Sequence, residues 1–297
     1  MKNILLFLFV VVVGALFVEC SEDGELTPTF IDRDRYNVSD FSSQEEMEIR
    51  NRFYEETGCF LVFNDSLAKR EAVTPAGIYI FVDTIDLNYA ASSRTQHKFD
   101  YTKLSTIEEK EAAADFLLNE VLTRMDTIYY PYSFFMVDSL IFTRYMVAGS
   151  MISYRDPIVM GSWVCYSTTI VACNGVFDMD AEERESYVRE VQKGMVLGMY
   201  TQLDSLDYVE FYNYSADYYE DPYEYLVDEN WEELGFIPNV WVNQEWYTQA
   251  NDVPTYIWEI FSMTKEEFDK KYGQWSIVLN KRDAMVRILE RHGIKVY

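Results

Sequence analysis

The spacing of apolar positions predicts five helices along the chain. Apolar side chains that recur every three or four residues fall on one face of a helix. Most of the predicted helices also follow Ser, Thr or Asp with Glu three residues later, which is the pattern of a capping box. The predicted helices are 44–57 after Ser43 and Glu46, 106–124 after Ser105 and Glu108, 181–202 after Asp180 and Glu183, a short helix after Thr264 and Glu267, and 281–292 before Gly293.

Three of these helices carry apolar stripes that we expect to face the core. The stripe of the longest helix is the clearest and marks it as the central helix. The stripes are Phe116, Leu117, Val121 and Leu122; Tyr187, Val188, Val191, Met195 and Met199; and Ala284, Met285, Ile288 and Leu289.

Short runs rich in β-branched and aromatic residues predict strands at 59–64, 77–85, 134–146 and 163–173. The stretch 204–233 shows no regular period, so we expect it to be irregular. Helices and strands that mix along the chain are typical of an α+β fold. We therefore expect one domain over 41–297, with a mixed sheet, a central helix and a helical C-terminal half.

The N-terminal segment predicts export and a lipid anchor. Lys2 and an apolar run over 4–18 are typical of a secretory signal peptide, expected here at 1–19, and the run is too short to span a membrane. Cys20 at its end resembles a bacterial lipobox, whose cysteine is acylated, although an ordinary signal peptide with an incidental cysteine remains the alternative. The acidic residues 21–23 resemble a signal for the outer face of the outer membrane. Residues 20–40 are polar and predict a tether.

The formal charge of −25 excludes whole classes of partner. Nucleic acid requires a basic surface, so we expect no nucleic-acid binding. Adhesion to anionic lipid is disfavoured for the same reason, and attachment to the membrane then depends on the lipid at Cys20. Aromatic residues make up 16% of the chain, which suits surfaces that bind sugars or peptides and equally suits plain packing.

The other three cysteines are Cys59, Cys165 and Cys173, an odd number that leaves at least one of them without an intramolecular partner. If 163–173 is one strand, its rise of about 3.3 Å per residue holds Cys165 and Cys173 about 26 Å apart. A disulfide requires Cα atoms within about 7 Å. We therefore expect buried thiols.

Several local strings follow one another in a characteristic order. They are CFLVFND at 59–65, Gly149-Ser150, Gly175 before an acidic helix start, WEELGFIP at 231–238, and the closing helix 281–293. This order resembles the zinc metallopeptidase-like lipoproteins that accompany outer-membrane nutrient-import systems. The resemblance covers about 41–294 and implies a zincin-like domain.

Members of that family carry H-E-x-x-H on the central helix, where two histidines one turn apart hold Zn²⁺ and the glutamate activates its water. The matching positions are Arg189-Glu190-Val191-Gln192-Lys193, of which only the glutamate matches. Arg189 and Lys193 stay protonated at neutral pH and would repel a dication. We therefore predict no bound metal and no cofactor, with Glu190 a remnant in a solvated or ion-paired position.

The other histidines of the chain do not readily complete a zinc site. The two are His97, expected in a loop, and His292, expected at the end of the last helix. A histidine at a helix C-terminus usually interacts with the helix dipole. Phosphate-binding, dinucleotide-binding and nucleophile-elbow motifs are absent from the sequence.

The stretch 204–233 is rich in acids and aromatics, with eleven Asp or Glu, seven Tyr and no Lys or Arg. One interpretation is a recognition surface on which Tyr218, Tyr219, Tyr223 and Trp231 stack on sugar rings or peptide side chains. The other is an exposed acidic loop whose aromatics pack onto the domain.

Two functions remain open. The favoured hypothesis is a surface-anchored, non-catalytic relative of a zinc metallopeptidase. It would bind peptides or glycans, or assist an outer-membrane transporter, during nutrient uptake. The alternative is an active hydrolase, with unusual zinc ligands or a carboxylate mechanism.

Overall fold

The computed structural model describes residues 34–74, 77–85, 87, 95–148, 151–165, 167–219, 231–238 and 247–297. The chain divides into two units, Met1–Arg35 and Tyr36–Tyr297, and nearly all of the described residues belong to the second. The predicted signal peptide, Cys20 and most of the predicted tether lie outside the described residues. Among the helices that are described, none has the length and apolar character needed to cross a membrane.

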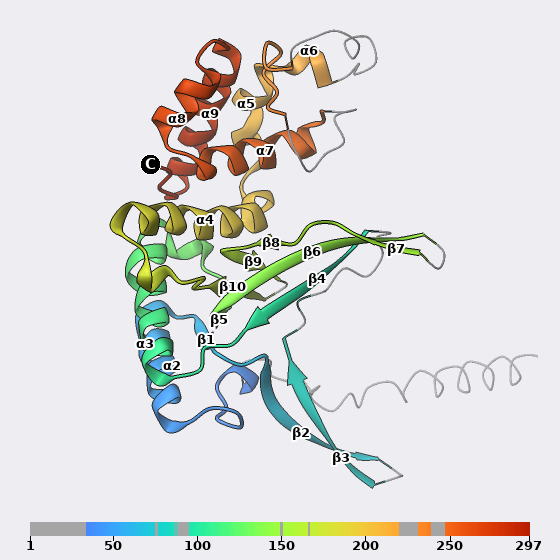
Figure 1. The fold of residues 1–297 in the computed structure, drawn as a ribbon, viewed down its shortest axis with the longest axis vertical. Helices are drawn as coiled ribbons and strands as arrows, with labels where there is room; N and C mark the ends of the chain where they lie inside the picture. Colours follow the sequence, from blue (N-terminus) through green and yellow to red (C-terminus); the bar gives the residue numbers. More distant parts are fainter. Residues whose placement is uncertain are drawn as a thin grey trace, which may run out of the picture. The chain divides into compact units, whose positions relative to one another are not determined.

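The described strands form three sheets (Figure 1). In the central sheet the order is β1 (Phe60–Val62), β5 (Ser133–Val137), β10 (Thr168–Ala172) and β9 (Ser162–Val164). The first three strands run parallel, and β9 lies antiparallel at the edge. A hairpin pairs β2 (Ser66–Thr74) with β3 (Gly77–Thr84). A further antiparallel sheet, called the second sheet from here on, contains β4 (Thr95–Thr102), β6 (Ser139–Ala148), β7 (Met151–Tyr154) and β8 (Ile158–Val159).

Helices form most of the rest of the second unit, particularly after β10. The α-helices are α2 (Gln44–Thr57), α3 (Ile107–Phe116), α4 (Ala181–Met199), α5 (Val209–Asn213), α6 (Ala216–Tyr219), α7 (Gln249–Ser262), α8 (Lys265–Tyr272) and α9 (Ser276–Arg291). A π-helical turn, η2 (Leu117–Val121), follows α3. The 3₁₀ turns are η1 (Asp34–Tyr36), η3 (Leu122–Arg124), η4 (Thr127–Tyr129), η5 (Val176–Asp178), η6 (Tyr200–Gln202) and η7 (Ser205–Tyr208). The prediction of an α+β fold with mixed strands and a helical C-terminal half is confirmed.

Most predicted helix starts are confirmed by the caps. Asp180 with Glu183 and Thr264 with Glu267 form the expected capping boxes. The cap of α3 was predicted one residue too early, because Thr106 and Glu109 form the box. Helix α9 begins at Ser276 rather than at 281, without a side-chain cap.

Two predicted strands are wrong. The segment 134–146 is divided at Asp138 into β5 and β6, which belong to different sheets. The segment 163–173 turns back on itself, so that β9 and β10 are antiparallel neighbours and Cys165 N–H donates to Thr168 O over 2.8 Å. The calculated separation of Cys165 from Cys173 therefore rests on a wrong premise.

The buried thiols expected from the sequence are present in part. Cys59 and Cys173 are free and buried, while Cys165 is half-buried. Burial raises the pKa of the Cys173 thiol to about 12, so this sulfur stays protonated and inert at neutral pH.

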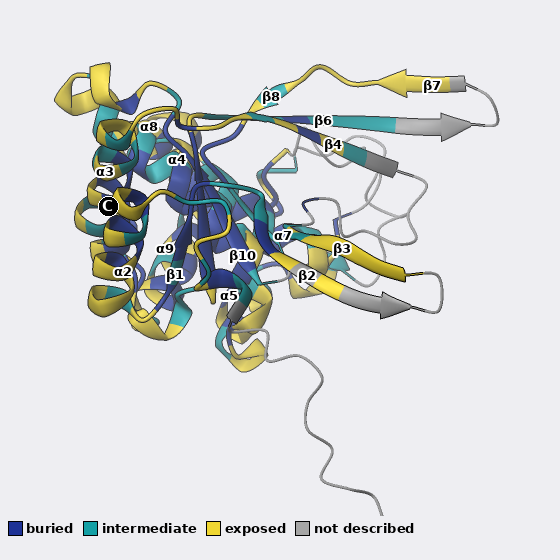
Figure 2. Cartoon of the chain, turned by 90° about the horizontal axis from the view of Figure 1, so that it is seen from below, coloured by how far each residue is buried: buried dark blue, intermediate teal, exposed yellow. Residues whose placement is uncertain are grey.

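The core lies on both faces of the central sheet. Because successive strand residues point to opposite faces, Phe134 and Met136 face the helices while Phe135 and Val137 face the second sheet. The core on the helix side of the central sheet includes the predicted stripes of α4 and α9. Val188, Val191, Met195 and Met199 are all buried, as predicted. Figure 2 shows this burial at the centre of the fold. Helix α4 packs against α7 on one side and against β9 on the other.

The hairpin strand β3 differs from the other strands because its apolar side chains are exposed. The five consecutive residues 78–82 are exposed on both faces of the strand, with Ile78 at 67% and Ile80 at 65% (Figure 2). These side chains bury little surface within the described part of the chain and contribute correspondingly little to its stability.

Candidate functional site

Helix α4 lies unusually close to the edge strand β9, and two glycines permit this approach. A Cβ on Gly194 would lie 2.3 Å from Ser162 Oγ, and a Cβ on Gly198 would lie 2.3 Å from Val164 Cβ. Real Cβ atoms do not approach other atoms so closely. The hydroxyl of Ser162 donates to the Val191 carbonyl over 2.6 Å, which fixes the helix on the strand.

Lys193, at the position matched to the second histidine of the family's motif, holds α4 to α7. Its side chain is buried, and its Nζ donates to Glu190 Oε2 over 2.5 Å and to Ser262 Oγ over 3.1 Å. The ammonium also lies 4.0 Å from the centroid of the Trp258 ring, which is cation–π geometry. Glu190 is therefore ion-paired, one of the two positions expected from the sequence.

Arg189, at the position matched to the first histidine of the motif, forms its ion pair with a different residue, Glu185. Its Nη1 lies 3.6 Å from Glu185 Oε1, and Glu185 also accepts two hydrogen bonds from Arg124. The Arg124 hydrogen bond is the main cause that lowers the pKa of Glu185, and the charge of Arg189 adds to it. This carboxylate therefore stays ionised and keeps both guanidinium groups in place.

These contacts do not fit a zinc site. A zinc ligand must offer a lone pair, and neither a guanidinium nor an ion-paired ammonium has one to offer. Among the described residues, no group of three or more His, Cys, Asp or Glu could hold a metal ion.

The two histidines have separate surroundings. His292 Nε2 lies 2.7 Å from Asp207 Oδ2, and its Nδ1 lies 2.5 Å from the Tyr129 hydroxyl. His97 is on strand β4 rather than in the predicted loop, and its ring packs against Phe142 and Trp163.

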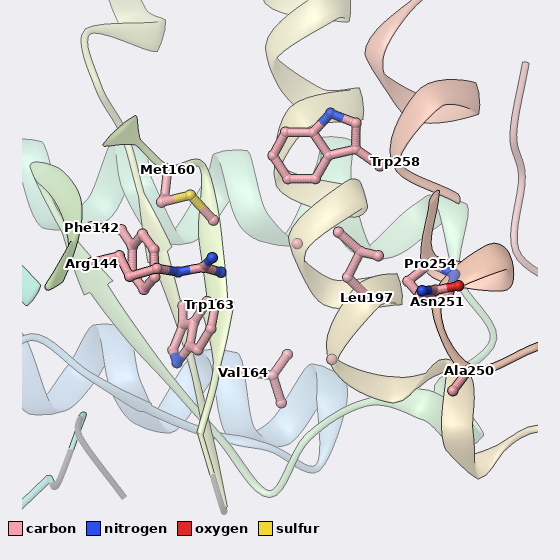
Figure 3. A pocket seen from close by; sticks show the side chains of 12 residues that line it. Phe142, Arg144, Met160, Trp163, Val164, Leu197, Ala250, Asn251, Pro254 and Trp258 are labelled. Atoms are coloured by element: carbon pink, nitrogen blue, oxygen red, sulfur yellow. The ribbon is translucent and has the colours of Figure 1, made fainter. Parts of the chain in front are cut away.

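A cavity of about 490 Å³ lies beside α4, between β9, the second sheet and α7 (Figure 3). This volume falls within the range of small-molecule sites in proteins. Most of the lining is apolar or aromatic, and the described lining residues include one cation and no carboxylate. The lining comprises Phe142, Arg144, Met160, Trp163, Val164, Gly194, Leu197, Gly198, Ala250, Asn251, Pro254 and Trp258.

The alternation of side chains along a strand explains which residues of the second sheet line the cavity. Phe142 and Arg144 are two residues apart on β6, so their side chains share a face. Their partners in register on β4 are Phe99 and His97. The ring of Trp163 lies 5.0 Å from Phe99 and 5.5 Å from Phe142, between centroids, which closes the aromatic wall.

Arg144 brings the positive charge to this wall, and Figure 3 shows its guanidinium extending between Met160 and Trp163 toward the cavity. Burial first, and then the charge of Arg144, lowers the pKa of His97. His97 is therefore neutral at pH 7, and Arg144 supplies the charge.

The opposite walls come from two helices. Gly194, Leu197 and Gly198 lie on one face of α4, while Asn251, Pro254 and Trp258 recur at helical spacing on α7. Asn251 Oδ1 accepts the Thr248 N–H over 2.8 Å as part of the cap of α7, which fixes the orientation of the Asn251 amide.

The stretch 204–233, which we expected to be irregular, contains short helices where the structure describes it. Residues 205–219 are largely helical, in η7, α5 and α6. Tyr218, Tyr219 and Trp231 are half-buried and pack against Leu234, Phe236 and Tyr247. Tyr223 lies outside the described residues. A ligand-binding role for these four residues remains a prediction.

Tyr219 also contributes to a buried ion pair. Its hydroxyl donates to Asp252 Oδ2, which accepts from Lys281 Nζ over 2.5 Å. Both charged side chains have 0% exposure, and Phe211, Phe236 and Tyr256 surround the ammonium. Burial raises the pKa of Asp252 and lowers that of Lys281.

No family model matches this chain, and neither a curated protein sequence nor a solved structure matches it. The resemblance to metallopeptidase-like lipoproteins therefore rests on the sequence alone, in the order of its local strings and predicted elements.

The sequence analysis located α4 but missed the cavity beside it. Helix α7, which supplies one wall, was not predicted because Pro254 interrupts an otherwise apolar helical pattern. The sequence did contain one signal of the close contact beside the cavity. Gly194 and Gly198 are four residues apart, so they lie on one face of the helix and allow a strand or another helix to approach closely.

Proposed function

We propose that this protein is a lipid-anchored, non-catalytic relative of zinc metallopeptidases that binds a ligand at the cell surface during nutrient uptake. The observation that carries this proposal is the contrast between two parts of α4. The former metal positions are filled by ion pairs, whereas the adjacent Gly194–Gly198 face lines an open cavity.

The arrangement of elements supports the relationship to zincin-like proteins. The central sheet has an antiparallel edge strand, β9, and the helix that carries the degenerate motif packs directly on it. Glu190, the remaining motif residue, is held by Lys193, and its neighbours at 189 and 193 offer no imidazole that could bind a metal beside it. The cavity then retains a binding role without hydrolysis.

Surface attachment is part of the same proposal. Acylation of Cys20 and a tether over 20–40 would place the domain outside the outer membrane, where it would present a peptide or glycan to a transporter. The cavity is smaller than a protein interface, so we propose that it receives a small ligand or the end of a longer one.

A peptide-hydrolysis assay separates this proposal from an active zinc hydrolase. The mature chain, from Cys20 onward, should leave a mixture of fluorogenic peptides uncut with or without added Zn²⁺. A variant with Arg189→His and Lys193→His is the comparison, since it restores the two imidazoles. Hydrolysis by the unmodified chain that a chelator abolishes would contradict the proposal.

A further inference from the structure

The hairpin strand β3 has an edge that pairs with no other described strand. Its residues 78–82 are apolar and exposed on both faces, and β2 is its only partner among the strands that the structure describes (Figure 2). Such an edge is a template for pairing with another chain, and proteins usually block it with charged side chains or proline. Residues 78–82 contain neither. The edge is therefore suited to receive a further strand.

The backbone hydrogen bonds of the hairpin show which groups of β3 face this edge. Lys69 of β2 donates its N–H to Asp40 Oδ2 over 2.7 Å, so this N–H points away from β3. Lys69 lies in register with Val82. Two residues directly opposite each other in an antiparallel pair either exchange hydrogen bonds or both direct their backbone groups outward. Val82 therefore directs its N–H and C=O toward the outer edge of β3.

The same direction recurs at every second residue of β3. Ile78 and Ile80 therefore also direct their N–H and C=O groups outward. A second hydrogen bond agrees with this phase, since Ile85 N–H donates to Asp65 O, just before β2, over 2.8 Å. Backbone groups that lack a partner are too costly to place in the hydrocarbon of a membrane. These groups therefore favour a protein strand over lipid as the occupant of this edge.

The distribution of charge favours a second copy of this chain as the protein that supplies this strand. The formal charge of −25 makes two copies repel each other over most of their surfaces. The hairpin is an exception, because residues 72–82 are uncharged and its four charged residues cancel. These four are Lys69, Arg70, Glu71 and Asp83. Two copies that meet at this hairpin bring together neutral surfaces.

We propose that two copies of this chain pair through the outer edges of their β3 strands, antiparallel about a two-fold axis at Ile80. In this register Ile80 lies opposite itself, and Ile78 lies opposite Val82 of the second copy. Tyr79 lies opposite Phe81 of the second copy. Residues with outward backbone groups then meet each other, which permits about six main-chain hydrogen bonds. The two hairpins form one sheet, and the assembly closes at two copies because each outer edge is used once.

This register also matches the side chains of the two strands. The aliphatic residues of the run alternate with its aromatic residues, so each kind gathers on its own face of the joined sheet. Cross-strand aliphatic and aromatic pairs of this kind stabilise antiparallel strands. Asp83 lies opposite Gly77 of the second copy, so no carboxylate faces another carboxylate across the axis.

The exposed area indicates a weak dimer. Exposed fractions between 44% and 67% over the five side chains correspond to roughly 500 Å² of surface per copy. Two copies offer roughly 1,000 Å², which is the lower limit for specific interfaces, and edge pairing buries only part of it. We therefore expect a dimer that dissociates on dilution. Salt should strengthen it, because salt screens the repulsion between two acidic chains.

Analytical ultracentrifugation of the mature chain, from Cys20 onward, tests the proposal. A reducing agent prevents free cysteines from linking two copies. We expect the mean mass to rise from one chain toward two as the protein concentration increases about a hundred-fold. The dissociation constant should fall at least three-fold between about 0.05 and 0.5 M NaCl.

The variant Ile80→Lys tests the position of the axis. It places two like charges opposite each other and should weaken the dimer at least ten-fold. Because Ile80 is exposed in the single chain, the variant should keep the fold, which circular dichroism checks. The matched control is Val159→Lys, which adds the same charge at an exposed apolar residue of β8, outside the hairpin. This control should dimerise as the wild type does.

A pair of opposite charges tests the register itself. Ile78→Lys and Val82→Asp should each weaken the dimer when introduced alone. Together they should restore it, because each new lysine then lies opposite a new aspartate of the second copy. The two positions are about 13 Å apart along one strand, so this recovery cannot arise within a single copy.

A wild-type dimer that Ile80→Lys weakens and that the double variant recovers supports the proposal. A wild-type chain that stays monomeric over the whole range overturns it, including one that instead sediments with phospholipid vesicles. A dimer unchanged by Ile80→Lys, or a double variant weaker than both single variants, also overturns it. So does growth beyond two copies, because the proposed pairing is closed.

Discussion

At the scale of single residues, the most consequential feature is a pair of opposite charges with no solvent exposure. Asp252 and Lys281 form an ion pair within an aromatic enclosure. Removing one partner leaves the other charge buried and uncompensated, which costs about 3–5 kcal/mol. We therefore expect Asp252→Asn to lower the free energy of unfolding by that amount in urea denaturation. The double variant Asp252→Leu with Lys281→Met should lose much less, and an Asp252→Asn protein as stable as the wild type would contradict this account.

His97, which packs beside the cavity, makes the stability of the fold depend on pH. Because its pKa is lowered below the ordinary 6.5 in the folded protein, the unfolded chain binds the proton more readily. Its contribution to stability is therefore complete above about pH 6.5 and is lost as the pH falls through the folded pKa. Thermal unfolding between pH 7.5 and 5 should show a smaller loss of stability in His97→Gln than in the wild type. Identical pH profiles would show that His97 titrates normally.

At the scale of elements, α4 is the part of the fold that the sequence predicted best. Its capping box and apolar stripe act locally, so they were visible without tertiary information. The divided strands were not visible in this way, because β5 and β10 are buried on both faces and lack the alternation that marks strand boundaries. The adjacent polar residues Asp138 and Ser139 were the local sign of the break between β5 and β6.

Because α4 is buried and the hairpin strand β3 is exposed, truncation to alanine should reduce stability strongly at Met195 and only slightly on the hairpin. Met195 is 2% exposed, and truncation of such a side chain typically costs about 2–5 kcal/mol. We expect Met195→Ala to lose a free energy of unfolding in this range by urea denaturation. The control Ile80→Ala, on the exposed strand β3, should change stability by less than about 0.5 kcal/mol. Equal losses of stability in the two variants would contradict the burial of α4 in the core.

At the scale of the whole molecule, the fold class was predictable but the site was predictable only in part. The resemblance assigns the proposed motif to positions 189, 190 and 193, and the contacts of Lys193 show how a lysine is accommodated at the last of them. The cavity depends on three segments far apart in sequence, β6, β9 and α7, whose association no local pattern encodes. Its residues Arg144, Trp163 and Trp258 were therefore not predicted.

The proposed attachment to the membrane makes a separate prediction. If Cys20 is acylated, Cys20→Ser should move the protein from the membrane fraction to the soluble fraction, because the lipid is the proposed anchor. Immunoblots of fractionated cells measure this, and protease treatment of intact cells tests exposure at the surface. Cys20→Ser protein that stays with the membrane would refute lipid attachment through this residue.

We propose that α4 carries ion pairs at the positions where zincin-like proteins carry their metal ligands. Elemental analysis of the purified mature chain, after incubation with Zn²⁺ and removal of the unbound metal, tests it most directly. We expect well under one zinc per chain, because Arg189 and Lys193 are paired cations without a lone pair to donate. One zinc per chain in the unmodified protein, together with peptide hydrolysis that a chelator abolishes, would contradict this expectation.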